Sequence, residues 1–136
     1  MRTSSPGAVD GAPRAWLRLE GLAVLALAVL LYARGSHSWL MFAVLFLAPD
    51  LSIAAYLAGP RLGALGYNAA HSYVGPAVAA TFAVLTGHPP TVACLWAAHI
   101  GFDRALGYGL KYPTRFADTH LGPLRTRRTR AISPAG

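Results

Sequence analysis

Residues 38–58 read SWLMFAVLFLAPDLSIAAYLA, and no other stretch says more about the architecture of this protein. A helix needs about 20 apolar residues to cross the hydrocarbon core of a bilayer, and Asp50 is the one charged residue here. Three further apolar stretches are residues 16–33, 62–86 and 90–110. Short connections with Gly or Pro between them favour antiparallel neighbours. The sequence therefore predicts an all-α fold, a polytopic membrane bundle of four transmembrane helices.

The composition agrees with a small integral membrane protein. Of the 136 residues, 54% are hydrophobic and 12% are charged, whereas about a quarter are charged in an average soluble domain. The mean hydropathy is +0.42. Residues 15–123 are expected to form the transmembrane domain. Residues 1–14, rich in Gly, Pro and Ser, and the basic residues 124–136 are expected to be disordered tails.

The net charge of +7 comes from arginines and lysine that gather on one side of the predicted bundle. With four crossings, Arg34 is the one basic residue on the opposite side. Cytoplasmic loops carry the excess of Lys and Arg, so both termini are predicted to be cytoplasmic, in the cell inner membrane. No aromatic residues alternate with the arginines of residues 125–130, which argues against nucleic-acid binding.

The first apolar stretch has an alternative reading as a signal peptide. Its uninterrupted core, residues 21–32, is short and follows a basic leader. Glu20 at its start and the poor cleavage context around Ala33 favour a transmembrane helix instead.

Polar residues recur at one depth of this apolar chain. Ionisable groups are costly in hydrocarbon and usually face the bundle interior, where they pair with one another. The 1.5 Å helical rise places most of them about 6–14 Å from the cytoplasmic face, with His99 deeper at about 16 Å. A carboxylate partner, Asp103 or Asp50, is expected for Arg104. The predicted polar cluster consists of Glu20, Asp50, Asn68, His71, His99, Asp103 and Arg104.

Helical spacing groups these residues further. Residues three and four apart share a helix face, which unites Asn68, His71 and Ser72 on one helix and Trp96, His99 and Asp103 on the next. Small residues at every fourth position, which allow helices to approach closely in membranes, form a second face: Ala93, Ala97, Gly101 and Ala105. Pro49 is expected to kink the second helix beside Asp50.

The Asp and His residues leave two interpretations open. One is interhelical polar packing, the usual role of such groups in membranes. The other is a divalent metal such as zinc or iron, bound by Asp50, His71, His99 and Asp103, because imidazole and carboxylate suit both metals. No local ligand motif specifies the metal.

Three further alternatives would place the protein in other functional classes. His71 and His99 could hold a haem, although their neighbours are polar for such a pocket. Glu20 in the first of four helices is similar in architecture to small multidrug transporters, so a small proton-coupled transporter stays open, as does a structural membrane subunit. The sequence is compatible with a monomer and with a homo-oligomer.

The segment after the last apolar stretch also has two readings. Lys111 and the neighbouring tyrosines suit an anchor at headgroup level. Asp118 and His120 either fold back as a cap over the polar cluster or lie in a solvated juxtamembrane loop.

Several motifs together resemble one family. They are Pro49-Asp50-Leu51-Ser52, residues 67–76 (YNAAHSYVGP), residues 99–104 (HIGFDR), and residues 107–112 (GYGLKY) with 118–122 (DTHLG). They are similar to the family called domain of unknown function 4260, over roughly residues 16–123. The resemblance implies a small bacterial integral membrane protein and no particular reaction.

A weaker similarity, in residue type alone, links Pro49-Asp50 and His71-Ser72 to membrane-bound metal-dependent hydrolases. Ser72 has no nucleophile elbow around it, which argues against a serine hydrolase.

Overall fold

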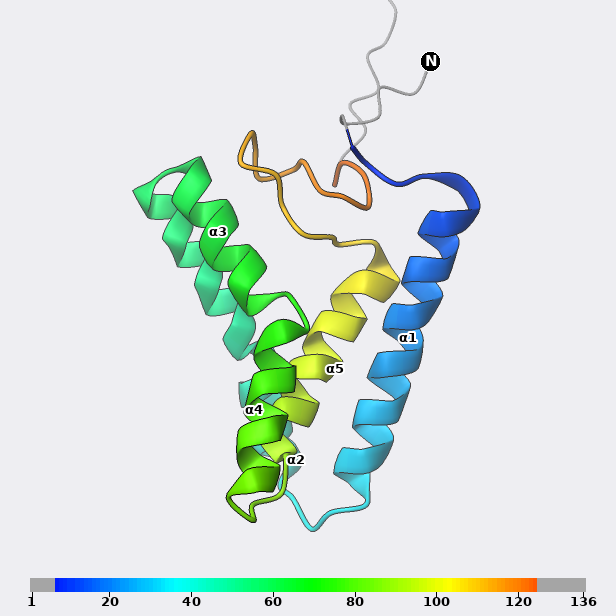
Figure 1. Cartoon of the computed structure of the whole chain (residues 1–136), viewed down its shortest axis with the longest axis vertical. Helices are drawn as coiled ribbons and strands as arrows, with labels where there is room; N and C mark the ends of the chain where they lie inside the picture. The colour runs from blue at the N-terminus through cyan, green and yellow to red at the C-terminus, as the bar shows by residue number, and fades with distance from the viewer. Residues whose placement is uncertain (1–6, 125–136) are drawn as a thin grey trace, which may run out of the picture.

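The computed structural model describes residues 7–124. Within this range the chain forms five α-helices and one 3-10 helix (Figure 1), which confirms the all-α prediction. Figure 1 shows α5 in the middle, with α1 along one side and α3 and α4 on the other. In chain order the elements are α1 (Gly11–Ala33), α2 (Trp39–Leu47), η1 (Ala48–Ala58), α3 (Pro60–Ala70), α4 (Val74–Leu85) and α5 (Thr91–Leu106).

Two helices within the described range are long and apolar enough to cross a membrane. They are α1 and the continuous segment Trp39–Ala58, which joins α2 and η1; the mean hydropathy of their most apolar windows is 1.8 and 2.0. Few residues of either are buried, unlike those of a core helix in a soluble protein. The other two predicted spans differ from expectation. Residues 62–86 are split between α3 and α4, and the helix predicted over 90–110 ends at Leu106.

At Pro49, where the sequence predicts a kink, the helix changes from α-helical to 3-10 geometry. α2 ends at Leu47, and η1 continues as a 3-10 helix of 11 residues with Pro49 in its first turn. Pro has no backbone N–H to donate to the preceding turn, so the α-helical ladder is interrupted there. A 3-10 helix rises about 2.0 Å per residue, and Asp50 therefore lies about 16 Å, rather than 12 Å, from Ala58.

The close helix approach predicted at Gly101 is confirmed. A Cβ at Gly101 would lie 2.6 Å from the backbone oxygen of Gly21 and 2.8 Å from the backbone nitrogen of Leu25. At Gly21 a Cβ would meet Arg104 and Ala105 of α5. The absence of a side chain on both helices thus lets the backbones of α1 and α5 touch.

The ends of the domain are tied together. α1 begins at Gly11 and so includes the last residues of the segment 1–14 that was expected to be disordered. Before it, the N–H of Val9 donates to the carbonyl of His120, 2.7 Å away. Residues 1–6 and residues 125–136, most of the predicted basic tail, lie outside the described residues.

We expect Gly101→Leu to destabilise the protein in detergent, because no rotamer can avoid the α1 backbone. Forced overpacking lowers the free energy of unfolding by about 1–3 kcal/mol in well-packed cores. Because the added side chain would meet backbone atoms here, we expect a loss at or above the upper end of this range. Thermal melting of the purified variant measures the loss. Ala26→Leu adds three carbons at an exposed position of α1 and should melt with the wild type; equal melting of both variants would contradict the close approach.

Candidate functional site

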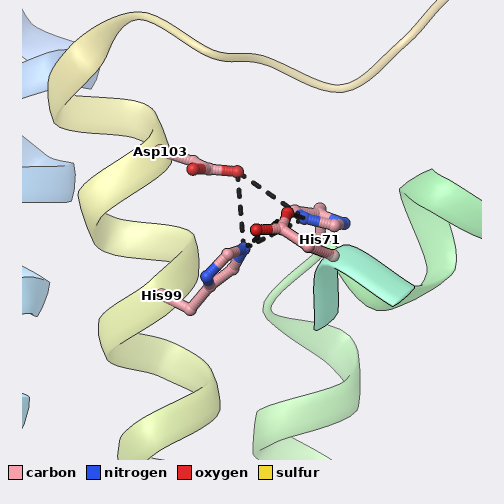
Figure 2. Close-up of side chains that lie close together, drawn as sticks. His71, His99 and Asp103 are labelled. Carbon is pink, nitrogen blue, oxygen red and sulfur yellow. Dashed lines mark hydrogen bonds and ion pairs between the residues drawn. The ribbon is translucent and has the colours of Figure 1, made fainter. Parts of the chain in front are cut away.

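Two histidines and two aspartates from three parts of the chain converge beside α5. Asp50 comes from η1, His71 from the end of α3, and His99 and Asp103 from α5. Figure 2 shows His71, His99 and Asp103 pointing toward one another. One ligand-type atom from each lies within 4.8 Å of all the others. The predicted convergence of Asp50, His71 and Asp103 is therefore confirmed.

The distances within this Asp/His cluster are short and similar. The Nε2 atoms of His71 and His99 are 3.1 Å apart. Each lies 3.4 Å from Asp50 Oδ1 and 3.6 Å from Asp103 Oδ2. Four ligands placed 2.0–2.1 Å from one zinc ion in a tetrahedron would be about 3.3–3.4 Å apart. These four residues could therefore hold one divalent metal with small adjustments.

The same distances argue against the haem alternative. Two axial imidazoles hold haem iron from opposite faces of the porphyrin. At usual metal–nitrogen distances their nitrogens would be about 4 Å apart, with the macrocycle between them. The 3.1 Å between the two Nε2 atoms leaves no room for that plane.

His71 reaches the cluster because the helix stops there. It caps the C-terminus of α3, with φ −110° and ψ 15°, and the next helix begins at Val74. Its Nδ1 lies 2.9 Å from the carbonyl oxygen of Tyr67. A neutral His71 that donates from Nδ1 has an unprotonated Nε2, so the lone pair of that nitrogen faces the carboxylates. Such a backbone contact is the usual way in which a ligand imidazole is oriented.

The carbonyls freed by this break are bound by α5. Trp96 Nε1 donates to the carbonyl of Ala70 over 2.6 Å, and Arg104 Nη2 donates to the carbonyl of His71 over 2.8 Å. Arg104 Nη1 donates to the carbonyl of Tyr108 over 2.9 Å. The expected ion pair of Arg104 with Asp103 or Asp50 is wrong: among residues 7–124 the guanidinium binds backbone carbonyls.

Tyr67 contacts two members of the cluster. Its ring stacks on the imidazole of His71, with centroids 3.7 Å apart and planes 7° apart. Its hydroxyl donates to Asp103 Oδ2 over 3.2 Å. Together with the carbonyl that accepts from His71, Tyr67 fixes the position of one imidazole and one carboxylate. His99 is less supported, because its buried Nδ1 has no hydrogen-bond partner within the described range.

Residues 107–124, which we call the cap, fold back over this end of the bundle. A Schellman motif ends α5, with hydrogen bonds from Gly107 N to Arg104 O and from Tyr108 N to Asp103 O. The chain then passes above Asp103 (Figure 2). The cap is buried at Lys111, Asp118, Thr119 and Leu121. Of the two readings of this segment, the cap is the correct one.

Asn68 holds the cap and does not join the cluster. Its side-chain amide donates to the carbonyl of Lys111 over 2.8 Å, and its Oδ1 accepts from the N–H of Lys111 over 2.6 Å. The Lys111 ammonium donates to the carbonyl of Phe116 and lies 4.7 Å from the centroid of the Tyr67 ring. Lys111 is 5% exposed, so it is a buried part of the cap and not a headgroup anchor.

Glu20 also stays apart from the cluster. It is exposed on α1, and α1 lies on the opposite side of α5 from the cluster residues (Figures 1 and 2). Within residues 7–124 no hydrogen bond or ion pair joins Glu20 to the other six residues of the predicted polar cluster.

Comparison with known proteins places the chain in a family. A family described as domain of unknown function (DUF4260) matches residues 14–124. The chain belongs to the DUF4260 family. No curated protein and no solved structure matches the chain. The resemblance inferred from the sequence motifs is therefore confirmed, and the matched region of this DUF4260 protein contains the whole cluster and its cap.

Two residues around the DUF4260 cluster were missed as site residues. Tyr67 precedes His71 by four positions, and that spacing is the one signal that could have drawn attention to it. Lys111 gave no such signal, since a lysine after an apolar stretch usually reaches the headgroups. Its burial follows from the turn of the cap, which depends on Asn68 some 43 positions earlier.

We expect the cap of this DUF4260 protein to become more stable as the pH rises above about 8. Burial lowers the pKa of Lys111 from 10.5 to about 8, although the charged form contacts the Phe116 carbonyl. The unfolded chain then binds more protons than the folded chain between these two values, so stability rises across that window. The stability that the folded protein gains from the neutral Lys111 is present above pH 10.5 and is lost as the pH falls through about 8.

Thermal melting of wild type and Lys111→Met at a series of pH values measures this effect. The melting temperature of the wild type minus that of the variant should be constant below the window and increase within it. A constant difference throughout would show that Lys111 titrates normally.

Proposed function

We propose that this protein is an integral membrane protein of the bacterial inner membrane with four crossings, over residues 16–33, 38–58, 62–86 and 90–110. Large apolar side chains point outward from all parts of the bundle, including Leu27, Leu57, Leu65 and Phe82 at 57–93% exposed. Soluble monomers rarely expose extended apolar surface. Residues 15–123 would then be the transmembrane domain.

The broken third crossing is compatible with this topology. The 11 residues of α3 and the 12 residues of α4 amount to about 34 Å of helical rise, enough for the hydrocarbon core. Non-helical backbone at membrane depth is tolerated where it is buried in protein. His71 between these helices is fully buried, and its carbonyl is bound by Arg104.

We further propose a metal-dependent membrane enzyme whose centre is Asp50, His71, His99 and Asp103, with one zinc or iron ion. The observation that carries this proposal is the set of five ligand–ligand distances between 3.1 and 3.6 Å. Two carboxylates balance the charge of a divalent cation, and the contact of His71 Nδ1 with the Tyr67 carbonyl favours the tautomer that a ligand needs. When bound, such a metal acts as a Lewis acid and lowers the pKa of water.

Residues around the proposed centre would position its ligands and leave one side open to a substrate. Tyr67 orients Asp103 and His71, and the cap closes the end of the bundle above them. The Asp50 side chain is 43% exposed, whereas the other three are at most 10% exposed. A substrate can therefore approach at Asp50 alone among the four.

A proton-coupled transporter is the second candidate, favoured by the same short distances. Imidazoles and carboxylates 3.1–3.6 Å apart can also share a proton, and such groups within a membrane commonly form proton relays. The two proposals differ in metal content. A structural subunit would contain no metal, and loss of the Asp50 charge would lower its stability without changing any ligand binding.

We expect protein purified in detergent to contain about one zinc or iron per chain, and Asp50→Asn to remain folded but bind that metal at least about tenfold more weakly. The amide keeps the shape of the carboxylate and removes its charge, and changes even outside the ligand shell cost 10–100-fold in affinity. Elemental analysis and zinc-dependent thermal shifts measure both effects.

Glu20→Gln is the matched control, since it removes a carboxylate of the same membrane bundle away from the cluster. It should retain the metal. Equal metal content and equal zinc response in wild type and Asp50→Asn would remove Asp50 from the site. A metal-free wild type whose proton exchange is abolished by Asp50→Asn would favour the transporter.

The one-sided distribution of arginines leads us to expect both termini in the cytoplasm. Reporter fusions after Gly87 and after Gly136 measure this. The first should be active in the periplasm and the second in the cytoplasm. A periplasmic signal at Gly136 is incompatible with four crossings in this orientation.

A further inference from the structure

The way into the Asp/His cluster is restricted. His71 and His99 are 0% and 2% exposed, Asp103 is 10% exposed, and Asp50 is 43% exposed. From above, the cap covers the cluster. Asn68 binds both polar groups of the Lys111 backbone, and Tyr67, under the Lys111 ammonium, donates to Asp103. The cluster is therefore reached past Asp50, along the surface of η1.

That surface is apolar. A 3-10 helix has three residues per turn, so Leu47, Asp50 and Ile53 follow one another along the same face of the segment. Leu47 is 58% exposed and Ile53 is 38% exposed. The segment Trp39–Ala58 to which they belong is one of the two apolar helices long enough to cross a membrane. The exposed edge of Asp50 thus lies within a surface that would face lipid.

Aromatic side chains form the other border of the approach. Phe46 of α2 contacts the imidazole of His99 edge-on, with ring centroids 5.2 Å apart. It also contacts Phe102 of α5, with centroids 5.7 Å apart, and Phe102 is 40% exposed. On this border a substrate would meet the rings of Phe46 and Phe102, which offer apolar contact to an alkyl chain and no hydrogen bond to a polar group.

We propose that the metal centre takes a membrane-dissolved amphiphile, which enters sideways from the bilayer past Asp50. Its alkyl chain lies along Leu47 and Ile53, and its polar head reaches the Asp/His cluster. This inference rests on the proposed metal centre and adds the class of its substrate. A water-soluble molecule with the same head is excluded because the cap closes the end of the bundle above Asp103.

Two hydroxamates with one metal-binding head test the proposal. The full chain is loaded with cobalt in phosphatidylcholine vesicles, and the visible absorption of the cobalt reports any new ligand. Lauroyl hydroxamate, which dissolves in the bilayer, is expected to shift the spectrum. Acetohydroxamate, which stays in water, is expected to leave it unchanged.

A matched pair of variants distinguishes binding along η1 from the mere partitioning of lauroyl hydroxamate into the bilayer. Ile53→Asn should require about ten times more lauroyl hydroxamate for the same shift, since the lost apolar contact is worth about 1.4 kcal/mol. Leu57→Asn changes an apolar residue of the same helix that is 93% exposed and lies off the Asp50 face. It should titrate like the wild type.

Three outcomes would overturn the inference while the metal centre stands: a spectral shift with acetohydroxamate, equal weakening in Ile53→Asn and Leu57→Asn, or no shift with either probe. A protein that takes up no cobalt contradicts the metal centre itself, and the inference falls with it. Cobalt uptake is measured before either hydroxamate is added, so the two failures are distinguished.

Discussion

The site depends on the hydrogen bonds from Trp96 and Arg104 to the carbonyls of Ala70 and His71, where α3 ends inside the bundle. The C-terminal end of a helix leaves backbone carbonyls without an intrahelical partner, and a buried carbonyl without any partner costs several kcal/mol in an apolar medium. Because α5 supplies both donors, the chain can stop one helix and begin another in its interior. The break in turn gives His71 a direction that no side chain within a continuous helix would have.

The cluster depends on that break and on a second irregular segment. His99 and Asp103 lie one turn apart on a regular helix and would face the same way in any α-helical fold. Asp50 lies on η1, where the 3-10 geometry begins at Pro49, and His71 lies beyond the last turn of α3. Regular helices therefore supply half of the ligand set, and interrupted helices supply the other half.

The sequence was informative where one helix decides the outcome. The periodicity of α5 predicted the His99–Asp103 row and the small-residue face at Gly101, since both follow from helical spacing alone. The sequence did not predict which individual side chains of distant segments contact one another. The break at His71 depends on Arg104, the fold of the cap depends on Asn68, and neither contact has a local signal. Glu20 was included because its depth matched the others, but depth says nothing about which side of a helix faces a neighbour.

The crossing of α1 and α5 has a consequence for biosynthesis. Gly21 and Gly101 are 80 positions apart, and ribosomes add about 5–20 residues per second, so α1 waits about 4–16 s for its partner. In the proposed topology with four crossings, the surface of α1 at Gly21 would face lipid or the insertion machinery during that interval. The first helix would then have to be stable in the bilayer by its own hydropathy, which its long apolar sequence permits, whereas the more polar α5 would enter a membrane that already holds its docking surface.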